Sequence, residues 1–182
     1  LSSIASIMKD RPVSAQVTMS SSENMIAQGI ALSKISKNII IKLPANYDGY
    51  LSLLKLKSIG IKTNITLCFD PVSAAFFSMS GATYVSMIMG RTDDFNLQQP
   101  SLIERTKKIF INMNAKAKIL GASFRTPHQV ELAMSQGADI LTIPPQTLEM
   151  LFNNPLTKTG LADFKTSWET LDLKVRENYE KS

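Results

Sequence analysis

The sequence predicts an α/β protein whose strands form one parallel sheet, folded as a TIM-type (β/α)8 barrel. Short apolar, β-branched runs alternate with amphipathic helical stretches along the 182 residues, as in repeated strand–helix units. Three helical stretches end in a glycine that is followed at once by a new strand, at Gly60, Gly81 and Gly137. Glycine adopts the left-handed conformation at a helix end without steric cost, so the same turn is predicted three times. Neither common Gly-rich phosphate loop is present, which favours a barrel over a dinucleotide-binding sheet.

The pattern gives six strands, at residues 12–18, 38–43, 61–67, 82–89, 117–122 and 139–143. Six strands cannot close an eight-stranded barrel. We therefore expect the first two units to be missing from this chain, ahead of Leu1, and the six strands to be the third to the eighth. Residues 1–182 are expected to form a single barrel domain.

The helices between these strands begin at recognisable signals. Single N-caps are predicted at Asn46, Asp70 and Thr126, and capping boxes at residues 20–23 and 101–104. A short helix is predicted over residues 1–8 and a polar loop over residues 91–100. Near the C-terminus we expect one helix over residues 148–152 and a last one over about 159–179.

Composition excludes several classes of function. The net charge is +5, but the basic residues are dispersed without interleaved aromatic residues, so no nucleic-acid partner is expected. The single cysteine, Cys68, rules out an intrachain disulfide framework and fits a reducing, cytoplasmic location. The single histidine, His128, rules out a His-rich metal site, and we expect no metal. No apolar run is long enough to cross a membrane, so no membrane association is expected.

One lysine stands inside an apolar strand, in the segment Ile-Ile-Ile-Lys-Leu-Pro at residues 39–44. An unpaired buried charge is costly, so such a lysine lowers its pKa or finds a partner. A lysine with a lowered pKa is a nucleophile for carbonyl carbons and forms a Schiff base. Alternatively, Lys42 lies at the strand end and reaches water along its flexible stem. This stretch alone leaves both interpretations open.

Polar side chains gather at the C-terminal ends of the predicted strands, where barrel enzymes carry their chemistry. They comprise a lysine, amides, hydroxyls and two arginines, namely Gln16, Lys42, Asn64, Thr66, Ser86, Arg91, Ser123 and Arg125. Taken singly, the hydroxyls are ordinary helix caps and the arginines ordinary surface residues. Together they suit a carbonyl substrate that carries a phosphate group.

Several segments resemble the transaldolase family, and within it the small members that include the fructose-6-phosphate aldolases. The matching segments are residues 39–44, 63–69, 81–91, 120–125 and 154–157. They occur in the family's order, and the resemblance covers about residues 8–172.

The resemblance implies an aldol mechanism through a lysine Schiff base, without cofactor. Lys42 would attack a ketose phosphate such as fructose 6-phosphate and keep a dihydroxyacetone unit. Transaldolases, enzymes of the pentose phosphate pathway, pass this unit to an aldose phosphate, whereas fructose-6-phosphate aldolases release it. By position, the resemblance implies that Thr66 and Gln16 hold the catalytic water, Asn64 and Ser86 bind the dihydroxyacetone hydroxyls, and Arg91, Ser123 and Arg125 bind phosphate. It also implies a homo-oligomeric ring in which the C-terminal helix packs on a neighbouring subunit.

Three features depart from the family pattern. Gln16 stands where transaldolases usually have glutamate and where the aldolases have glutamine. Ile88 stands where the aldolases have tyrosine. The family's aspartate on the first strand and asparagine on the second are not in this chain. The readings left open are therefore a transaldolase, a fructose-6-phosphate aldolase and a non-catalytic member that binds a sugar phosphate or serves as an assembly subunit.

Overall fold

The computed structural model describes residues 1–91 and 101–181, so most of the predicted polar loop at 91–100 lies outside the described residues. The chain divides into two compact units, Leu1–Pro144 and Pro145–Ser182. The predicted sheet lies entirely within the first unit. The expectation of a single barrel domain stays a prediction.

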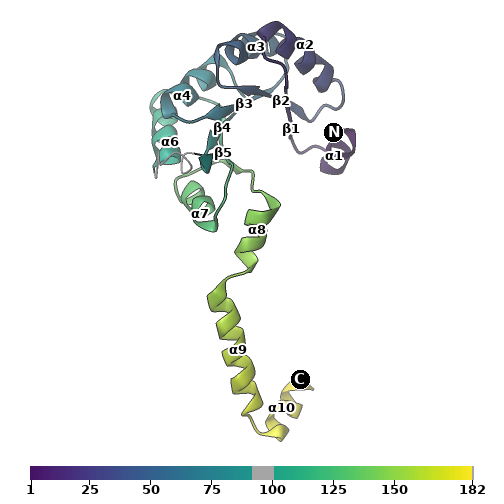
Figure 1. Cartoon of the computed structure of the whole chain (residues 1–182), viewed down its shortest axis with the longest axis vertical. Coiled ribbons are helices and arrows are strands. Elements are labelled where there is room, and N and C mark those ends of the chain that lie inside the picture. The colour runs from purple at the N-terminus through teal and green to yellow at the C-terminus, as the bar shows by residue number, and fades with distance from the viewer. Residues whose placement is uncertain (92–100, 182) are drawn as a thin grey trace. The chain divides into compact units, whose positions relative to one another are not determined.

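The first unit contains one parallel sheet of six strands in chain order, which confirms the six predicted strands. The sheet is curled into a half-barrel (Figure 1), as expected of a TIM-barrel-like fold. The two further units expected ahead of Leu1 remain a prediction. The strands are β1 (Val13–Gln16), β2 (Ile39–Pro44), β3 (Thr63–Cys68), β4 (Tyr84–Ile88), β5 (Lys118–Ala122) and β6 (Ile140–Leu141).

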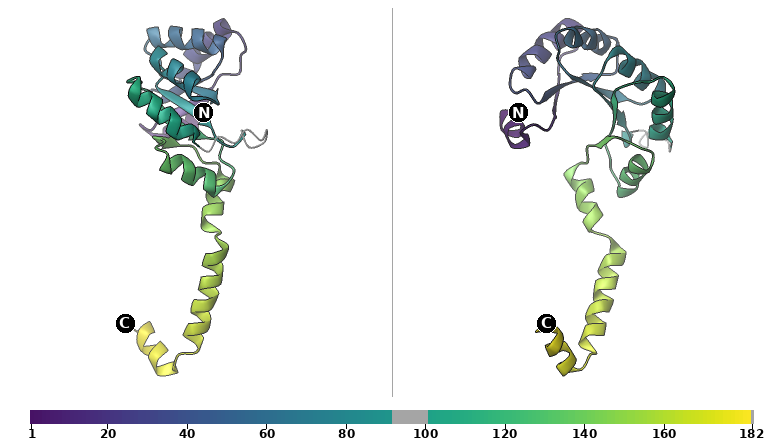
Figure 2. Two further views of the ribbon diagram at one scale, coloured as in Figure 1. Left: turned by 90° about the vertical axis from the view of Figure 1, so that its left-hand side faces the viewer. Right: turned by 180° about the vertical axis from the view of Figure 1, so that it is seen from behind.

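Helices surround the outside of the curved sheet (Figure 2). Three of them end in the predicted turns, since Gly60, Gly81 and Gly137 have φ angles of 78°, 107° and 88°. This left-handed conformation is open to glycine without strain. The helices of this unit are α1 (Ser2–Met8), α2 (Ser22–Ser33), α3 (Tyr47–Ser58), α4 (Pro71–Ser80), α6 (Leu102–Asn112) and α7 (Pro127–Ser135).

The three single N-caps are confirmed. The side chains of Asn46, Asp70 and Thr126 accept hydrogen bonds from backbone N–H groups three residues on, at 2.8, 2.8 and 3.3 Å. Each bond satisfies one of the N–H groups that a helix start leaves without a partner. These caps fix where α3, α4 and α7 leave the C-terminal edge of the sheet.

The two predicted capping boxes are corrected by the structure. The N-cap of α2 is Ser21 rather than Ser20, and the Ser22 N–H donates to the carboxylate of Asp48 on α3 at 2.8 Å. Ser101 is the N-cap residue of α6, but its side chain makes no capping bond. The Glu104 N–H donates instead to the side-chain oxygen of Gln136 at 3.3 Å. In both cases a residue distant in sequence takes part in the helix start.

The sheet has two different faces because successive side chains of a strand point to opposite sides. The outer face packs on the helices through fully buried residues such as Ile41, Leu43 and Ile65. Each such side chain contributes about 1.5–3 kcal/mol by its removal from water. The inner face carries a small apolar cluster on β4 and β5, formed by Ile88, Leu120 and Ala122. The remaining inner positions, on β1 to β4, are mostly polar.

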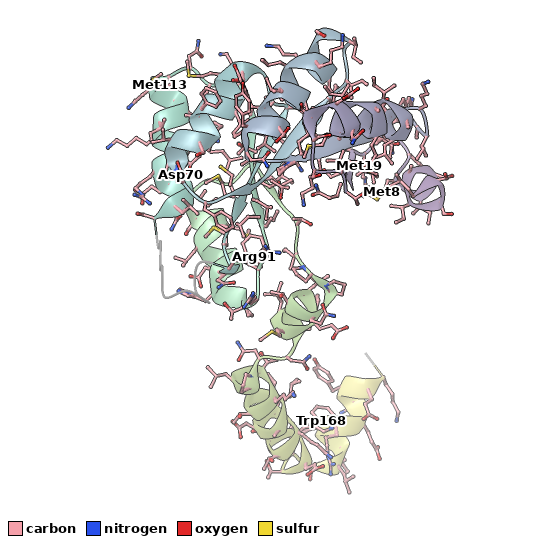
Figure 3. The ribbon with its side chains drawn as sticks, turned by 45° about the horizontal axis from the view of Figure 1, so that its top comes forward. Met8, Met19, Asp70, Arg91, Met113 and Trp168 are labelled. Atoms are coloured by element: carbon pink, nitrogen blue, oxygen red, sulfur yellow. The ribbon has the colours of Figure 1, made fainter. Side chains whose placement is uncertain are left out.

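The second unit consists of α8 (Pro145–Phe152), α9 (Pro155–Glu169) and α10 (Leu173–Glu180). The helix predicted over about 159–179 is thus two helices, because the Asp172 carboxylate accepts the Lys174 N–H at 2.9 Å and starts a new helix. No residue of α9 or α10 is buried. Trp168, labelled in Figure 3, packs edge to face on Tyr179, with the two ring centroids 5.4 Å apart.

Candidate active site

Lys42 occupies the inner face of β2, between two residues that point the other way. Its neighbours Ile41 and Leu43 are fully buried against the helices, whereas Lys42 is only partly buried. Within the described residues, the ammonium group has neither a hydrogen bond nor an ion pair. The amine is thus held on the concave side of the sheet.

Burial lowers the pKa of Lys42 below its ordinary value. The physical cause is desolvation, which disfavours the charged form of an amine. A lower pKa raises the neutral fraction at physiological pH, and the neutral amine is the nucleophile. The lowered pKa agrees with one of the two interpretations of Lys42 that the sequence left open.

Gln16 lies beside Lys42 in the next strand. The two residues are in register between β1 and β2, and the Gln16 side-chain NH2 donates to the Lys42 carbonyl at 3.1 Å and to the Val17 carbonyl at 3.0 Å. These bonds occupy the amide nitrogen and leave the side-chain oxygen without a partner among the described residues. The free oxygen can accept a hydrogen bond from a water or a substrate hydroxyl.

A bulge at the end of β3 places Thr66. The pairing of β3 with β4 shifts register between Ile65 and Cys68, and Leu67 has a φ of 59°, which is rare for a branched residue. Thr66 pairs in register with Pro44, two residues beyond Lys42, and is 4% exposed. Its hydroxyl makes no hydrogen bond within the described residues, so this group is available at the C-terminal edge of the inner face.

Asn64 and Ser86 are bonded to each other. The Ser86 hydroxyl donates to the Asn64 side-chain oxygen at 2.7 Å, and the Asn64 side-chain NH2 donates to the Ser14 hydroxyl at 3.0 Å. Asn64 is in register with Lys42 on the neighbouring strand. A polar chain therefore crosses the inner face from β1 to β4, past the position of Lys42.

The ends of β4 and β5 come together at Gly90. A Cβ on Gly90 would lie 2.0 Å from the Ser123 carbonyl oxygen and 3.1 Å from the Cγ of Arg125, so only glycine fits there. Ser123 has a φ of 63°, and the Arg125 N–H donates to the Gln129 side-chain oxygen at 2.8 Å. The next residue after Gly90 is Arg91, which is exposed and is labelled in Figure 3.

The predicted site residues therefore fall into two groups on the described part of the chain. Gln16, Lys42, Asn64, Thr66 and Ser86 are joined by register and hydrogen bonds across β1 to β4. Arg91, Ser123 and Arg125 meet around Gly90 at the ends of β4 and β5.

Sequence reasoning did not single out Ser14 or Gly90. Ser14 could have been found from alternation, because it stands two residues before Gln16 and so faces the same side. The role of Gly90 could not be predicted from its neighbours in sequence, because the contact that requires a glycine comes from Ser123, just after β5.

Other reactive groups do not compete with Lys42. Burial raises the pKa of the Cys68 thiol to about 12, so the thiol stays protonated at neutral pH.

The described residues contain no group of three or more His, Cys, Asp or Glu side chains that could hold a metal ion. No helix in the described part of the chain is both long and apolar enough to cross a membrane.

Comparisons with known proteins agree on one family. A family model described as Transaldolase/Fructose-6-phosphate aldolase matches residues 1–180. A probable transaldolase of Carboxydothermus hydrogenoformans is 41% identical over 162 residues, covering 89% of this chain and 76% of that protein. A probable transaldolase of Rhizobium meliloti is 42% identical over 164 residues, which cover 90% of this chain and 76% of that protein. For a probable transaldolase of Caulobacter vibrioides the identity is 39% over 157 residues, covering 86% and 72%.

Among solved structures, the chain is similar in fold to a 3-keto-L-gulonate-6-phosphate decarboxylase from Vibrio cholerae. The TM-score is 0.53 at 10% sequence identity, and the match covers 73% of this chain. The chain spans 62% of the length of that structure. At this identity the likeness concerns the fold alone.

The lowered pKa of Lys42 predicts a pH-dependent stability difference. Between the lowered pKa and the unfolded value near ~10.4, the folded chain binds fewer protons than the unfolded chain, so Lys42 makes stability rise with pH. We expect Lys42→Met to be more stable than the parent below the lowered pKa. The gain should fade as the pH climbs towards about 10.4.

Urea unfolding at several pH values measures this difference. Circular dichroism is the suitable signal, because the single tryptophan lies in the second unit. Lys55→Met, which removes an exposed lysine from α3, is the matched control for the loss of a lysine charge. A gain for Lys42→Met that is the same at every pH would contradict the desolvation of Lys42.

Proposed function

The chain belongs to the transaldolase/fructose-6-phosphate aldolase family, and from this premise we propose that it transfers a dihydroxyacetone unit between sugar phosphates through a Schiff base on Lys42. One observation carries the proposal. Lys42 is the partly buried amine on the inner face, it has a lowered pKa, and it makes no ion pair within the described residues. Such an amine is suited to attack a ketone.

The proposed reaction begins with imine formation. The neutral amine attacks C2 of fructose 6-phosphate or sedoheptulose 7-phosphate, and water leaves as the carbon–nitrogen double bond forms. The protonated imine then accepts the electron pair of the C3–C4 bond as that bond breaks. The C4 hydroxyl loses its proton, an aldose phosphate leaves, and an enamine of dihydroxyacetone remains on Lys42.

Transfer reverses these steps with a second aldose phosphate. The enamine carbon attacks the acceptor aldehyde, a proton reaches the new hydroxyl, and water hydrolyses the imine. With fructose 6-phosphate as donor and erythrose 4-phosphate as acceptor, the products are glyceraldehyde 3-phosphate and sedoheptulose 7-phosphate. The Thr66 hydroxyl and the free side-chain oxygen of Gln16 are proposed to hold the water that carries these protons. A positioned water of this kind is a known route for general acid–base catalysis.

Substrate hydroxyls and phosphate are assigned to the remaining groups. Asn64 and Ser86 are proposed to bind the dihydroxyacetone hydroxyls, using the hydrogen-bonding capacity that their mutual bond leaves over. Arg91, Ser123 and Arg125 are proposed to bind the phosphate group. Guanidinium groups suit this role because they form paired hydrogen bonds with phosphate oxygens.

A fructose-6-phosphate aldolase is the second candidate. Gln16 favours it, because a glutamine cannot take up a proton as the glutamate usual in transaldolases can. Ile88 disfavours it, because this buried apolar residue stands where the aldolases have tyrosine. Supplying erythrose 4-phosphate separates the two: formation of sedoheptulose 7-phosphate identifies a transaldolase, and free dihydroxyacetone identifies an aldolase. A non-catalytic sugar-phosphate-binding member would form neither.

We further propose a homo-oligomeric ring acting in the cytoplasm, with the second unit contributing to subunit contacts. Large apolar side chains of α9 and α10 are exposed in the single chain, which supports docking on another copy. Short isolated helices are also marginal in water without such packing. The exposed residues are Leu156, Leu161, Phe164, Leu173, Val175 and Tyr179.

Lys42→Arg is the direct test of the nucleophile. This variant keeps the positive charge, but its guanidinium stays protonated and cannot form an imine. We expect the variant to fold and to form no adduct with fructose 6-phosphate that borohydride can trap, as read by mass spectrometry of the intact protein. The parent chain should gain the mass of one reduced dihydroxyacetone or ketose unit. An adduct on the variant would place the nucleophile at another lysine.

Arg125→Ala tests the phosphate assignment. Removing a hydrogen-bonded charge costs roughly 1.5–3 kcal/mol, so we expect KM for phosphorylated ketoses to rise about 10- to 100-fold. KM for unphosphorylated ketoses should change little. Arg105→Ala, which removes an exposed arginine from α6, is the matched control. Equal losses with both kinds of ketose would remove Arg125 from the phosphate site.

Deleting residues 172–182 tests the role of the last helix in assembly. The deletion removes α10 and its exposed apolar residues, so the contacts that we propose between copies should weaken. We expect static light scattering to give a lower solution mass for the shortened chain than for the full chain at the same concentration. An unchanged mass would mean that α10 takes no part in the contacts between copies.

A further inference from the structure

Ser14 makes a contact that the proposed function does not use. It lies on β1, two residues before Gln16, and its hydroxyl accepts a hydrogen bond from the Asn64 side chain on β3 at 3.0 Å. The bond passes over β2, the strand that carries Lys42 and stands between β1 and β3 in the sheet. No backbone pairing joins β1 to β3, so this side-chain bond is a direct link between them across the inner face.

The Asn64 carboxamide makes a hydrogen bond through both its nitrogen and its oxygen. Its NH2 group donates to Ser14, and its oxygen accepts from the Ser86 hydroxyl at 2.7 Å. Asn64 is 1% exposed and Ser86 is fully buried, so water contributes little to holding the amide. Two fixed bonds at opposite ends of a planar group determine both its position and its tilt.

The two bonds use only part of the hydrogen-bonding capacity of the Asn64 carboxamide. A carboxamide has two N–H donors and two acceptor lone pairs, and Ser14 and Ser86 use one of each. Within the described residues, the second N–H and the second lone pair have no partner. Asn64 is in register with Lys42, so these unused groups lie on the strand next to the reactive amine.

We propose that Ser14 is a positioning residue for Asn64: its hydroxyl holds the carboxamide at the angle at which the unused N–H and lone pair meet the substrate carried by Lys42. This inference rests on the proposed function. Ser14 does not itself touch the reacting atoms. It acts through Asn64, and its loss leaves the amide held only from the Ser86 side.

A purely structural role for Ser14 makes a different prediction. If the bond only tied β1 to β3, its loss would lower stability and leave the turnover of the folded enzyme unchanged. Ser14 is exposed, so the alanine variant creates no buried cavity and should fold. A misdirected amide, in contrast, reduces turnover in a protein that is fully folded, because small errors of geometry at a reacting centre are costly.

The experiment compares Ser14→Ala, Ser14→Thr, Asn64→Ala and the double variant Ser14→Ala/Asn64→Ala. For each, kcat and KM are measured with fructose 6-phosphate and erythrose 4-phosphate, and borohydride trapping is measured without acceptor. Ser14→Ala should lower kcat about tenfold, with a smaller change in KM, while Lys42 is still trapped. Ser14→Thr keeps the hydroxyl and should restore most of kcat. The double variant should be no slower than Asn64→Ala, because Ser14 acts only through Asn64.

Several outcomes would overturn the inference. An unchanged kcat in Ser14→Ala, a Ser14→Thr variant as slow as Ser14→Ala, or losses that multiply in the double variant would each do so. Ser135→Ala, which removes an exposed hydroxyl from α7, is the control and should keep full activity. If the parent chain forms no trappable adduct, the proposed function fails, and the positioning role fails with it. If the parent is trapped and Ser14→Ala turns over normally, only the positioning role fails.

Discussion

The structure depends on the placement of one amine in an apolar strand. A parallel strand covered on its outer face by helices must be apolar there, and Ile39, Ile41 and Leu43 meet this demand. Lys42 lies outside this core because its side chain points to the inner face of the sheet. There it is partly buried, and this burial lowers its pKa. Within the described residues its amine makes no ion pair. The helical layer therefore supplies the stability that lets the inner face carry a costly group.

The inner face is divided along the sheet between polar and apolar positions. On β1 to β4 it carries polar residues such as Ser14, Gln16, Asn64, Thr66 and Ser86, and on β4 and β5 it also carries the apolar cluster of Ile88, Leu120 and Ala122. Two hydrogen bonds hold the buried Asn64 carboxamide and offset part of the cost of burying it. Strain appears where strands end, at Leu67 and Ser123, which both have positive φ angles. Residues held this way are over-represented where a protein positions functional groups.

Local rules predicted the strands and most helix starts, and long-range contacts account for the rest. The caps at Asn46, Asp70 and Thr126 followed from sequence because each bond spans three residues. The cap of α2 is one residue later than predicted, at Ser21, which accepts the Asn24 N–H. The start of α6 did not follow from local sequence, because its Glu104 N–H donates to Gln136, just after α7. The sequence placed the candidate residues at the C-terminal ends of strands, whereas Asn64 is the second residue of β3 and Ser86 is the middle residue of β4. It could not show that Asn64 bonds Ser86 and Ser14, since those bonds depend on the register of four strands.

Gln16 constrains how the proposed reaction can handle protons. Its side-chain nitrogen is bound to the Lys42 and Val17 carbonyls, so the oxygen is the part of the amide left to face a ligand. An amide oxygen can orient a water but cannot remove its proton at neutral pH. In the proposed reaction Lys42 is bound as a protonated imine when the substrate hydroxyl loses its proton, so the proton passes to the water that Thr66 and Gln16 are proposed to hold. Gln16 then orients this water without taking up the proton.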